Sequence, residues 1–477
     1  MAKRDNLSQM VMKAMGLFGG VQILGVLCSI VRTKLVALWI GPVGVGLFGL
    51  FNNALEMINT AAGLGVRNSS VRDISQALET GNRQRLALVI TVVRRWSFWL
   101  GLAGALLTLL LSPLLSQITF GNTEYVWGFV ALSIAVLLGT LSNGEQAVLQ
   151  GSSQLRRLAT ANLWGTVAGL LVSIPLFYGL RERSVLPSIL AYAVATALAL
   201  WFLRNKAYPA AKATRVQTLT VGRDFVRLGI FMTIGTFASI LASYVFNAWL
   251  NHHAGTQAVG YYQAGYTLII KYTGLILSAL GMEYYPRLAR VVSHRERLRV
   301  FVSQELNVTL LVMVPVVALF IVLREWIVVL LYRADFITII DMVSWGMLGA
   351  LFRAISWCMS FVMLAKGDGR TYVVTEVASA AIGLALNVSF YHLWGLTGLG
   401  LSFLAWYVIY TIIVAYVYYV RYGLSLSRGS VGGMCWAVAA VGGVVASMQA
   451  HCVVLAIALV LISLTVSAHQ LLKSWKR

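Results

Sequence analysis

The chain has 477 residues, of which 59% are hydrophobic and only 11% are charged, and its formal net charge is +21. A soluble protein of this length could not hide so large an apolar fraction, so the composition excludes a soluble globular domain. The basic charge does not indicate a nucleic-acid partner, because the cations lie in short segments between long apolar runs. This arrangement is typical of a multi-pass membrane protein.

Fourteen stretches of the chain approach the roughly 20 predominantly apolar residues that a membrane-spanning helix needs. The sequence therefore predicts an all-α integral membrane protein with about fourteen transmembrane helices. The first apolar run is too long for a signal peptide and has no cleavage site, so we expect it to be retained. We interpret 324–338 as an excursion at the outer face. The expected spans are 13–40, 46–66, 94–115, 124–150, 157–179, 185–203, 227–250, 258–280, 300–323, 339–365, 371–393, 396–420, 431–449 and 452–472.

The basic residues predict the topology of these spans. Of the 37 lysines and arginines, 29 fall in segments on one face of the predicted membrane, four on the other face and four within spans. Lysine and arginine concentrate in the cytoplasmic loops of membrane proteins. We therefore expect both termini to be cytoplasmic.

An internal repeat relates the two halves of the chain. A shift of 214 residues places 29–46 on 243–260, with Gly41 on Gly255. Six spans separate the copies, so both halves keep one orientation, with a pseudo-twofold axis along the membrane normal. The predicted organisation is a six-helix lobe at 1–203, a cytoplasmic linker at 204–226, a second six-helix lobe at 227–423 and a terminal helix pair and tail at 424–477.

Four cations and one acid lie deep within the expected spans: Arg32, Lys34, Lys271, Arg353 and Glu56. A charge at the centre of a spanning helix costs about 2.5–3.5 kcal/mol on insertion scales and usually faces a water-filled interior. One acid cannot neutralise four cations, so we expect a cationic cavity between the lobes that binds an anionic substrate, with Glu56 balancing charge or serving ion coupling. The alternative is structural ion pairing of Glu56 with Arg32 or Lys271. Because Arg32 and Lys34 point about 200° apart on a helix, we favour Arg32 as the cavity-facing residue.

Three further acids lie near the cytoplasmic ends of their spans: Glu145, Glu305 and Glu376. Two interpretations are open, a cytoplasmic gate formed with Arg156, Arg157 or Arg370, and ordinary interfacial salt bridges. Arg94 and Arg95 precede an aromatic stretch. We interpret them as interfacial anchors, with capture of a substrate headgroup as the alternative, and we also include them among the candidate residues of the cytoplasmic gate.

The sequence contains no motif of an enzyme that uses a metal or a nucleotide. It has no D-x-D motif, its expected outer loops are short, and His252–His253 has no acidic or cysteine neighbour at metal-ligand spacing. It also has no P-loop. We therefore predict a transporter without a metal or organic cofactor, driven by an ion gradient or the membrane potential, with a proton or Na⁺ as the candidate coupling ion.

Two stretches carry a resemblance to a known family. "LWIGPVGVGLFGLFNNALEMINTAAGLGVRNSSVRDIS" (38–75) resembles the opening of the polysaccharide-transport flippases of the MOP superfamily, which include the flippases for O-antigen and related lipid-linked oligosaccharides. "LSPLLSQITFGNTEY" (111–125) is similar to the third-helix exit and outer turn of that family. Fourteen spans and duplicated lobes extend the resemblance over essentially the whole chain.

The resemblance implies a flippase of the bacterial inner membrane. An undecaprenyl-pyrophosphate-linked oligosaccharide, such as a repeat unit of O-antigen or another surface polysaccharide, would move from the cytoplasmic to the periplasmic leaflet by alternating access. Related lipid II flippases use a first-helix arginine, for which Arg32 is the counterpart, and a lipid-tail groove in their last two helices, here 431–472. They carry an acid after that arginine, whereas Thr33 stands here, which favours a surface-polysaccharide substrate over lipid II.

The resemblance also implies partners for this protein, and it leaves alternative functions open. The implied partners are the lipid-linked substrate, membrane lipids and, as further candidates, the polymerase and chain-length proteins of a polysaccharide assembly system. The rival functions are a multidrug or cation antiporter or a lipid II flippase of the same superfamily. A membrane-embedded glycan polymerase or ligase is disfavoured by the missing outer catalytic loop.

Overall fold

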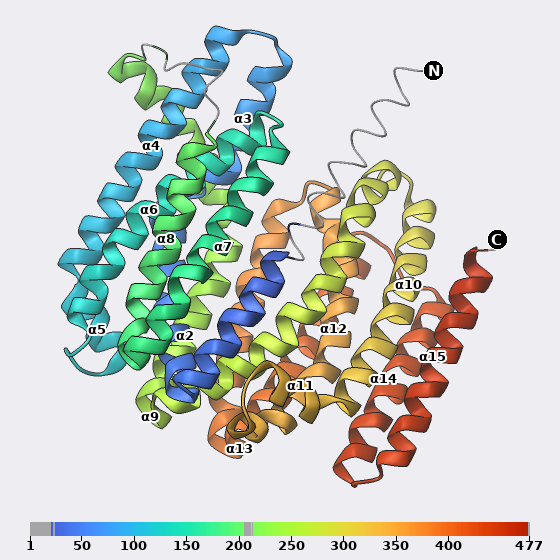
Figure 1. Cartoon of the computed structure of the whole chain (residues 1–477). Helices are drawn as coiled ribbons and strands as arrows, with labels where there is room; N and C mark the ends of the chain where they lie inside the picture. Colours follow the sequence, from blue (N-terminus) through green and yellow to red (C-terminus); the bar gives the residue numbers. More distant parts are fainter. Residues whose placement is uncertain (1–20, 22–23, 205–210, 212, 476–477) are drawn as a thin grey trace. The chain divides into compact units, whose positions relative to one another are not determined.

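The computed structural model describes residues 21, 24–204, 211 and 213–475, and all regular elements in them are helical (Figure 1). A first helix covers residues 24–39. In the described chain it is followed by fourteen labelled α-helices and two short 3-10 helices. Their bounds are α2 (Pro42–Gly63), α3 (Val66–Glu79), α4 (Arg83–Leu110), α5 (Ser112–Phe120), α6 (Val126–Gly151), α7 (Leu155–Leu180), η1 (Arg181–Ser184), α8 (Val185–Phe202), α9 (Arg215–Val291), α10 (Arg295–Val322), α11 (Arg324–Leu331), η2 (Ala334–Ile339), α12 (Ile340–Ala365), α13 (Gly369–Val420), α14 (Arg428–Gln449) and α15 (Val453–Trp475).

Some of the expectations above fall outside the described residues. These are the basic N-terminal segment, the start of the first expected span (13–20), linker residues 205–210 and 212, and the last two residues of the tail.

The helices account for the expected membrane crossings. Nine segments of the described chain are long and apolar enough to cross a membrane. Three of them hold two helices each, namely α7 with α8 and the two halves of α9 and of α13. With the helix at 24–39 and α2, the described chain has a helix or half-helix at the position of each of the fourteen expected spans, and the all-α prediction is confirmed. α2 is not among the nine because it carries three asparagines and a glutamate. The 324–338 stretch contains only the eight-residue α11 and part of the six-residue η2, both too short to cross.

The chain forms two compact units, Met1–Val259 and Gly260–Arg477. In the first unit α6 packs against α4 and α8, and in the second α12 packs against α10 and α13. The first half of α9 belongs to the first unit, where Gly229 lies so close to Gly65 that a Cβ at either position would overlap backbone atoms. The lobe and linker boundaries drawn from the sequence repeat remain a prediction.

The repeat is visible in the helix boundaries and the backbone. A shift of 214 residues places the bounds of α6, 126–151, on those of α12, 340–365. It likewise places α7, 155–180, on the part of α13 that precedes Gly395. Duplicated helix lengths at one constant offset indicate that the two halves share one local architecture.

The interruptions between helices repeat as well. Gly41 has φ 82° and ψ −164°, and Gly255, its partner under the shift, has φ 78° and ψ 170°. Both values lie in a region that is essentially restricted to glycine. Arg181 (φ 48°, ψ −123°) falls on Gly395 (φ 57°, ψ −137°), so an arginine occupies a break that has a glycine in the other half.

The break at residue 181 generates a prediction about stability. A non-glycine residue at such a positive φ costs of order 1–3 kcal/mol, so Arg181→Gly should raise the melting temperature of the purified protein in detergent. Gly395→Ala should lower it. Arg183→Gly, in the same turn but at an ordinary φ, is the control and should not raise it. Equal effects of both arginine substitutions would contradict the assignment of strain to Arg181.

Candidate functional site

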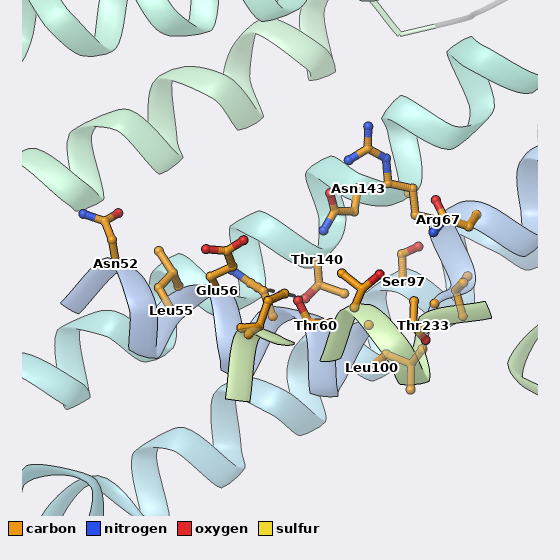
Figure 2. A pocket seen from close by; sticks show the side chains of 18 residues that line it. Asn52, Leu55, Glu56, Thr60, Arg67, Ser97, Leu100, Thr140, Asn143 and Thr233 are labelled. Carbon is orange, nitrogen blue, oxygen red and sulfur yellow. Dashed lines mark hydrogen bonds between the residues drawn. The ribbon is translucent and has the colours of Figure 1, made fainter. Parts of the chain in front are cut away.

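The first unit holds a polar cavity of about 500 Å³, drawn in Figure 2. Small-molecule sites commonly have volumes of 300–1,000 Å³. Helices α2, α3, α4, α6 and the first half of α9 all contribute polar side chains to it. These are Asn52, Glu56, Asn59, Thr60, Arg67, Asn68, Ser97, Thr140, Asn143, Thr233 and Thr236.

The cavity exists because α2 is amphipathic within the membrane. Its lining residues recur every third or fourth position over 52–63, which places them on one face of the helix. The other face is core, since Leu50, Phe51 and Ala54 are at most 1% exposed. The apolar face therefore holds α2 in the bundle and leaves the polar face toward the cavity.

Two glycines of α6 allow the neighbouring helices to come close. A Cβ at Gly139 would lie 2.9 Å from Nδ2 of Asn59, and a Cβ at Gly144 would overlap Ser97. The Thr140 hydroxyl donates to Oδ1 of Asn59 at 3.4 Å. The amide of Asn59 is thus positioned by α6 at the wall of the cavity.

Glu56 is the one residue of this cavity that the sequence analysis singled out. Its side chain is exposed and lines the cavity (Figure 2). The amides and hydroxyls around it were not predicted. A usable signal was present, because the polar residues of 52–63 have the spacing of one helix face inside a predicted span.

Arg32 lies against aromatic rings and is not among the residues that line this cavity in the described chain. Its guanidinium carbon is 5.0 Å from the ring centre of Phe48 and 5.3 Å from that of Tyr192, within cation–π range. Its Nε is buried and has no hydrogen-bond partner in the described residues. Lys34 lies two positions along the same helix and is partly exposed.

The structure brings Arg353 next to the segment that carries Lys271. Nη1 of Arg353, on α12, donates to the Ile270 carbonyl at 3.3 Å and lies 3.2 Å from the Thr273 hydroxyl, both on α9. Lys271 is therefore adjacent in sequence to a carbonyl that Arg353 contacts, and its side chain is exposed. These two cations of the second unit share one region. That these two cations and Arg32 line a single cavity remains a prediction.

The repeat relates this cationic region to the polar cavity of the first unit. Under the shift of 214 residues, Arg353 falls on Gly139 and Thr273 on Asn59. The contact between Gly139 and Asn59 in the first unit thus has its counterpart in the contact between Arg353 and Thr273. Corresponding helix pairs, α2 with α6 and α9 with α12, therefore carry an amide in one half and a guanidinium in the other.

Glu145 forms an ion pair with Arg94 and not with Arg156 or Arg157. Nε and Nη2 of Arg94 donate to the two carboxylate oxygens at 2.6 and 3.0 Å, in bidentate geometry. The side chains are 27% and 18% exposed. The pair lines a second, mostly apolar cavity of about 480 Å³ between α4, α6 and α8. Arg94 therefore links α4 to α6, and its role as an interfacial anchor remains a prediction.

The remaining gate residues have other partners than expected. Glu376 accepts a hydrogen bond from the Tyr410 hydroxyl at 2.5 Å within the second unit. Glu305 is half-buried and makes no salt bridge in the described part of the chain. Arg95 donates to the Ala213 carbonyl at 2.8 Å, which ties the segment before α9 to α4. A cytoplasmic gate made of these residues remains a prediction.

Asp368 organises the turn before α13. It accepts hydrogen bonds from the Thr371 amide, from Nε of Arg421 at 2.5 Å and from the Tyr422 hydroxyl at 2.9 Å. Burial alone would raise the pKa of Asp368, but these hydrogen bonds outweigh burial and lower the pKa to about 2. The carboxylate is therefore ionised throughout the physiological range and holds Arg421 to the start of α13.

This helical architecture is that of the MOP-superfamily transporters. A structure described as the lipid II flippase MurJ in an inward closed conformation matches with a TM-score of 0.73 at 12% identity, covering 97% of this chain and 100% of the other. An inward-facing multidrug resistance MATE family transporter of the MOP superfamily matches with a TM-score of 0.72 at 15% identity, covering 84% and 94%.

The chain belongs to the family described as polysaccharide biosynthesis protein, whose model matches residues 74–341, more than half of its length. It is also similar to the lipid III flippases of Escherichia coli (strain K12) and Shigella flexneri. Each is 22% identical over 388 residues, covering 79% of this chain and 90% of the relative. The family expected from the sequence is thereby confirmed.

The Arg94–Glu145 pair generates a prediction about stability. Glu145→Gln leaves a partly buried guanidinium without its counter-ion, and hydrogen bonds to charged groups contribute about 1.5–3 kcal/mol. We expect a loss of that order in thermal or denaturant unfolding in detergent, with partial recovery when Arg94 is also replaced by Gln. Glu283→Gln is the control, because its pair with Arg287 is 68% and 58% exposed and should contribute little. Equal losses in the two single variants would contradict a special role for Glu145.

Proposed function

We propose that this protein is a flippase for a lipid-linked oligosaccharide. The substrate would be an undecaprenyl-pyrophosphate carrying a repeat unit of O-antigen or of another surface polysaccharide. It would pass from the cytoplasmic to the periplasmic leaflet of the bacterial inner membrane by alternating access. Membership of the polysaccharide biosynthesis family and the MOP fold support this class of function.

The observation that carries the proposal is the placement of Arg353 beside the segment of Lys271. A pyrophosphate that crosses an apolar barrier must exchange its hydration for other donors. Nη1 of Arg353 donates to two oxygens of α9, and a guanidinium has five N–H donors in a planar fork. The fork matches phosphate oxygens, and the adjacent lysine adds a second positive charge.

We place both termini in the cytoplasm and the substrate's lipid tail toward the bilayer, with membrane lipids as its surroundings. The polymerase and chain-length proteins of a polysaccharide assembly system are the proposed protein partners. Glu56 is the proposed site of charge balance or of ion coupling, with a proton or Na⁺ as the coupling ion.

A multidrug or cation antiporter is the second candidate function. Glu56 in the cavity of the first unit favours it, because a carboxylate attracts cationic compounds, and one structural neighbour is a multidrug transporter. Export of a cationic dye by vesicles that contain the protein, without movement of a lipid-linked oligosaccharide, would support this candidate over the flippase.

Substitution of the three intramembrane cations tests the proposed flippase function directly. Loss of one charge-assisted contact worth roughly 1.5–3 kcal/mol should weaken transport about tenfold to a hundredfold. We expect Arg353→Gln, Lys271→Gln and Arg32→Gln to reduce surface glycan accordingly while the protein remains in the membrane. Arg353→Lys should rescue only in part, because a point charge does not reproduce the bidentate fork.

The control for these variants is Arg290→Gln, which removes one positive charge from an exposed position of α9. It should leave surface glycan unchanged. Full transport in the triple variant of Arg32, Lys271 and Arg353 would refute the role of the cations. If these variants were instead lost from the membrane, and exchanging the charges of a cation and its acidic partner restored the protein, the cations would form structural ion pairs.

Glu56 is tested by Glu56→Gln, which keeps the size and one acceptor oxygen but removes the charge. If the carboxylate balances charge or takes up a coupling ion, transport in vesicles should change its dependence on pH or on Na⁺ while abundance holds. A purely structural acid predicts that abundance and transport fall together. Unchanged transport, ion dependence and abundance would dismiss both roles.

A further inference from the structure

We propose that the polar cavity of the first unit binds the sugar part of the substrate, and that it recognises uncharged, hydroxyl- and amide-bearing sugars. This inference rests on the proposed flippase function. It adds a second binding region to the cations Arg353 and Lys271, with a different chemistry.

The size of the cavity indicates an organic ligand. A water molecule occupies about 30 Å³ of liquid, and a metal ion needs oxygen ligands that converge at about 2.0–2.6 Å. A volume of about 500 Å³ is far larger than either requires and lies in the range of small-molecule sites. The cavity therefore has room for one or more sugar rings.

The lining indicates a ligand that both donates and accepts hydrogen bonds. Asparagine side chains from two helices, Asn59 of α2 and Asn143 of α6, each offer two N–H donors and one acceptor oxygen. Hydroxyls from α6 and α9 also donate and accept. Sugar hydroxyls and acetamido groups have the same dual character, so many of their polar groups can be paired at once.

The charges of the lining do not select an acidic ligand. Among the lining residues one is acidic, Glu56, and one is basic, Arg67 (Figure 2). Their formal charges cancel, so the lining has no excess of positive charge to attract a carboxylate or a phosphate. The lining therefore favours uncharged sugars over acidic ones.

The site is also held rigidly. Asn59 accepts from Thr140 and lies over Gly139, so the amide is held by contacts between two helices and not by a loop. Preformed polar groups on packed helices lose little freedom when a ligand binds, which favours selective recognition.

Gly63 offers a way to fill the cavity without disturbing the fold. It lies at the end of α2 and lines the cavity, and a Cβ built there meets no atom within 4 Å. Gly63→Leu should therefore occupy ligand space while the helices stay in place. The matched control is Gly179→Leu, because Gly179 lies near the end of α7, outside the cavity, and its Cβ position is equally open.

The experiment compares two lipids on the full-length protein in detergent. The probes are undecaprenyl pyrophosphate carrying N-acetylglucosamine and undecaprenyl pyrophosphate alone. We expect the wild type and Gly179→Leu to bind the sugar-bearing lipid more tightly than the sugar-free lipid. Gly63→Leu should lose about tenfold in affinity for it, the loss expected for one or two hydrogen bonds, and keep its affinity for the sugar-free lipid.

Side-chain deletions provide a second test that does not depend on Gly63. Asn143→Ala should show the same selective loss. Asn53→Ala is its control, because Asn53 lies on α2 but is not a lining residue. Its Nδ2 donates to the Gly49 carbonyl at 2.8 Å, and its Oδ1 accepts from the Ser243 hydroxyl at 3.2 Å. Melting temperatures of all variants should stay near that of the wild type.

Four outcomes would overturn the proposal. The cavity does not hold the sugar if the wild type binds both lipids with equal affinity, or if Gly63→Leu loses equal affinity for both. If the protein still transports the sugar-bearing lipid in that case, the proposed flippase function is unaffected. If Gly63→Leu weakened the binding of the cation tetraphenylphosphonium and of neither lipid, the cavity would be a site for cationic drugs. Failure of the wild type to bind or flip either lipid would refute the flippase function, and the sugar site with it.

Discussion

A polar or charged group inside a membrane span must find a partner other than bulk water, and this constraint explains most of what distinguishes the present structure. The chain meets it in three ways. Arg94 forms a bidentate ion pair with Glu145, Arg353 donates to backbone and hydroxyl oxygens of α9, and Arg32 makes cation–π contacts with two aromatic rings. Where the partner is another fixed charge, the residue holds helices together. Where donors remain for a ligand, the residue can contribute to binding.

The duplicated architecture allows one backbone arrangement to carry two chemistries. Helix lengths and breaks repeat at a constant offset because bilayer thickness and helix-breaking geometry act on both halves alike. Side chains at the repeated contact have diverged, since Asn59 beside Gly139 in one half corresponds to Thr273 beside Arg353 in the other. The first half thereby presents amides and an acid, and the second presents cations.

These two chemistries suit the parts of a lipid-linked oligosaccharide. A pyrophosphate needs fixed positive charge, whereas neutral sugars need paired donors and acceptors with little net charge. The two proposals rest on different residues, because Arg353 and Lys271 belong to one unit and the residues of the amide-lined cavity belong to the other. Either proposal can therefore be tested on residues that the other does not use.

The amino-acid sequence by itself determined the membrane class, the all-helical fold, the repeat and the family. Insertion depends on apolar windows of about 20 residues, and the repeat depends on positions such as Gly41 and Gly255, all of which are local. Partner choice was decided only by the tertiary structure. Glu145 pairs with Arg94, 51 positions away, and not with the nearer Arg156, because helix packing selects which faces meet. The cavity around Glu56 arises in the same way, from five helices whose polar faces converge only after they pack.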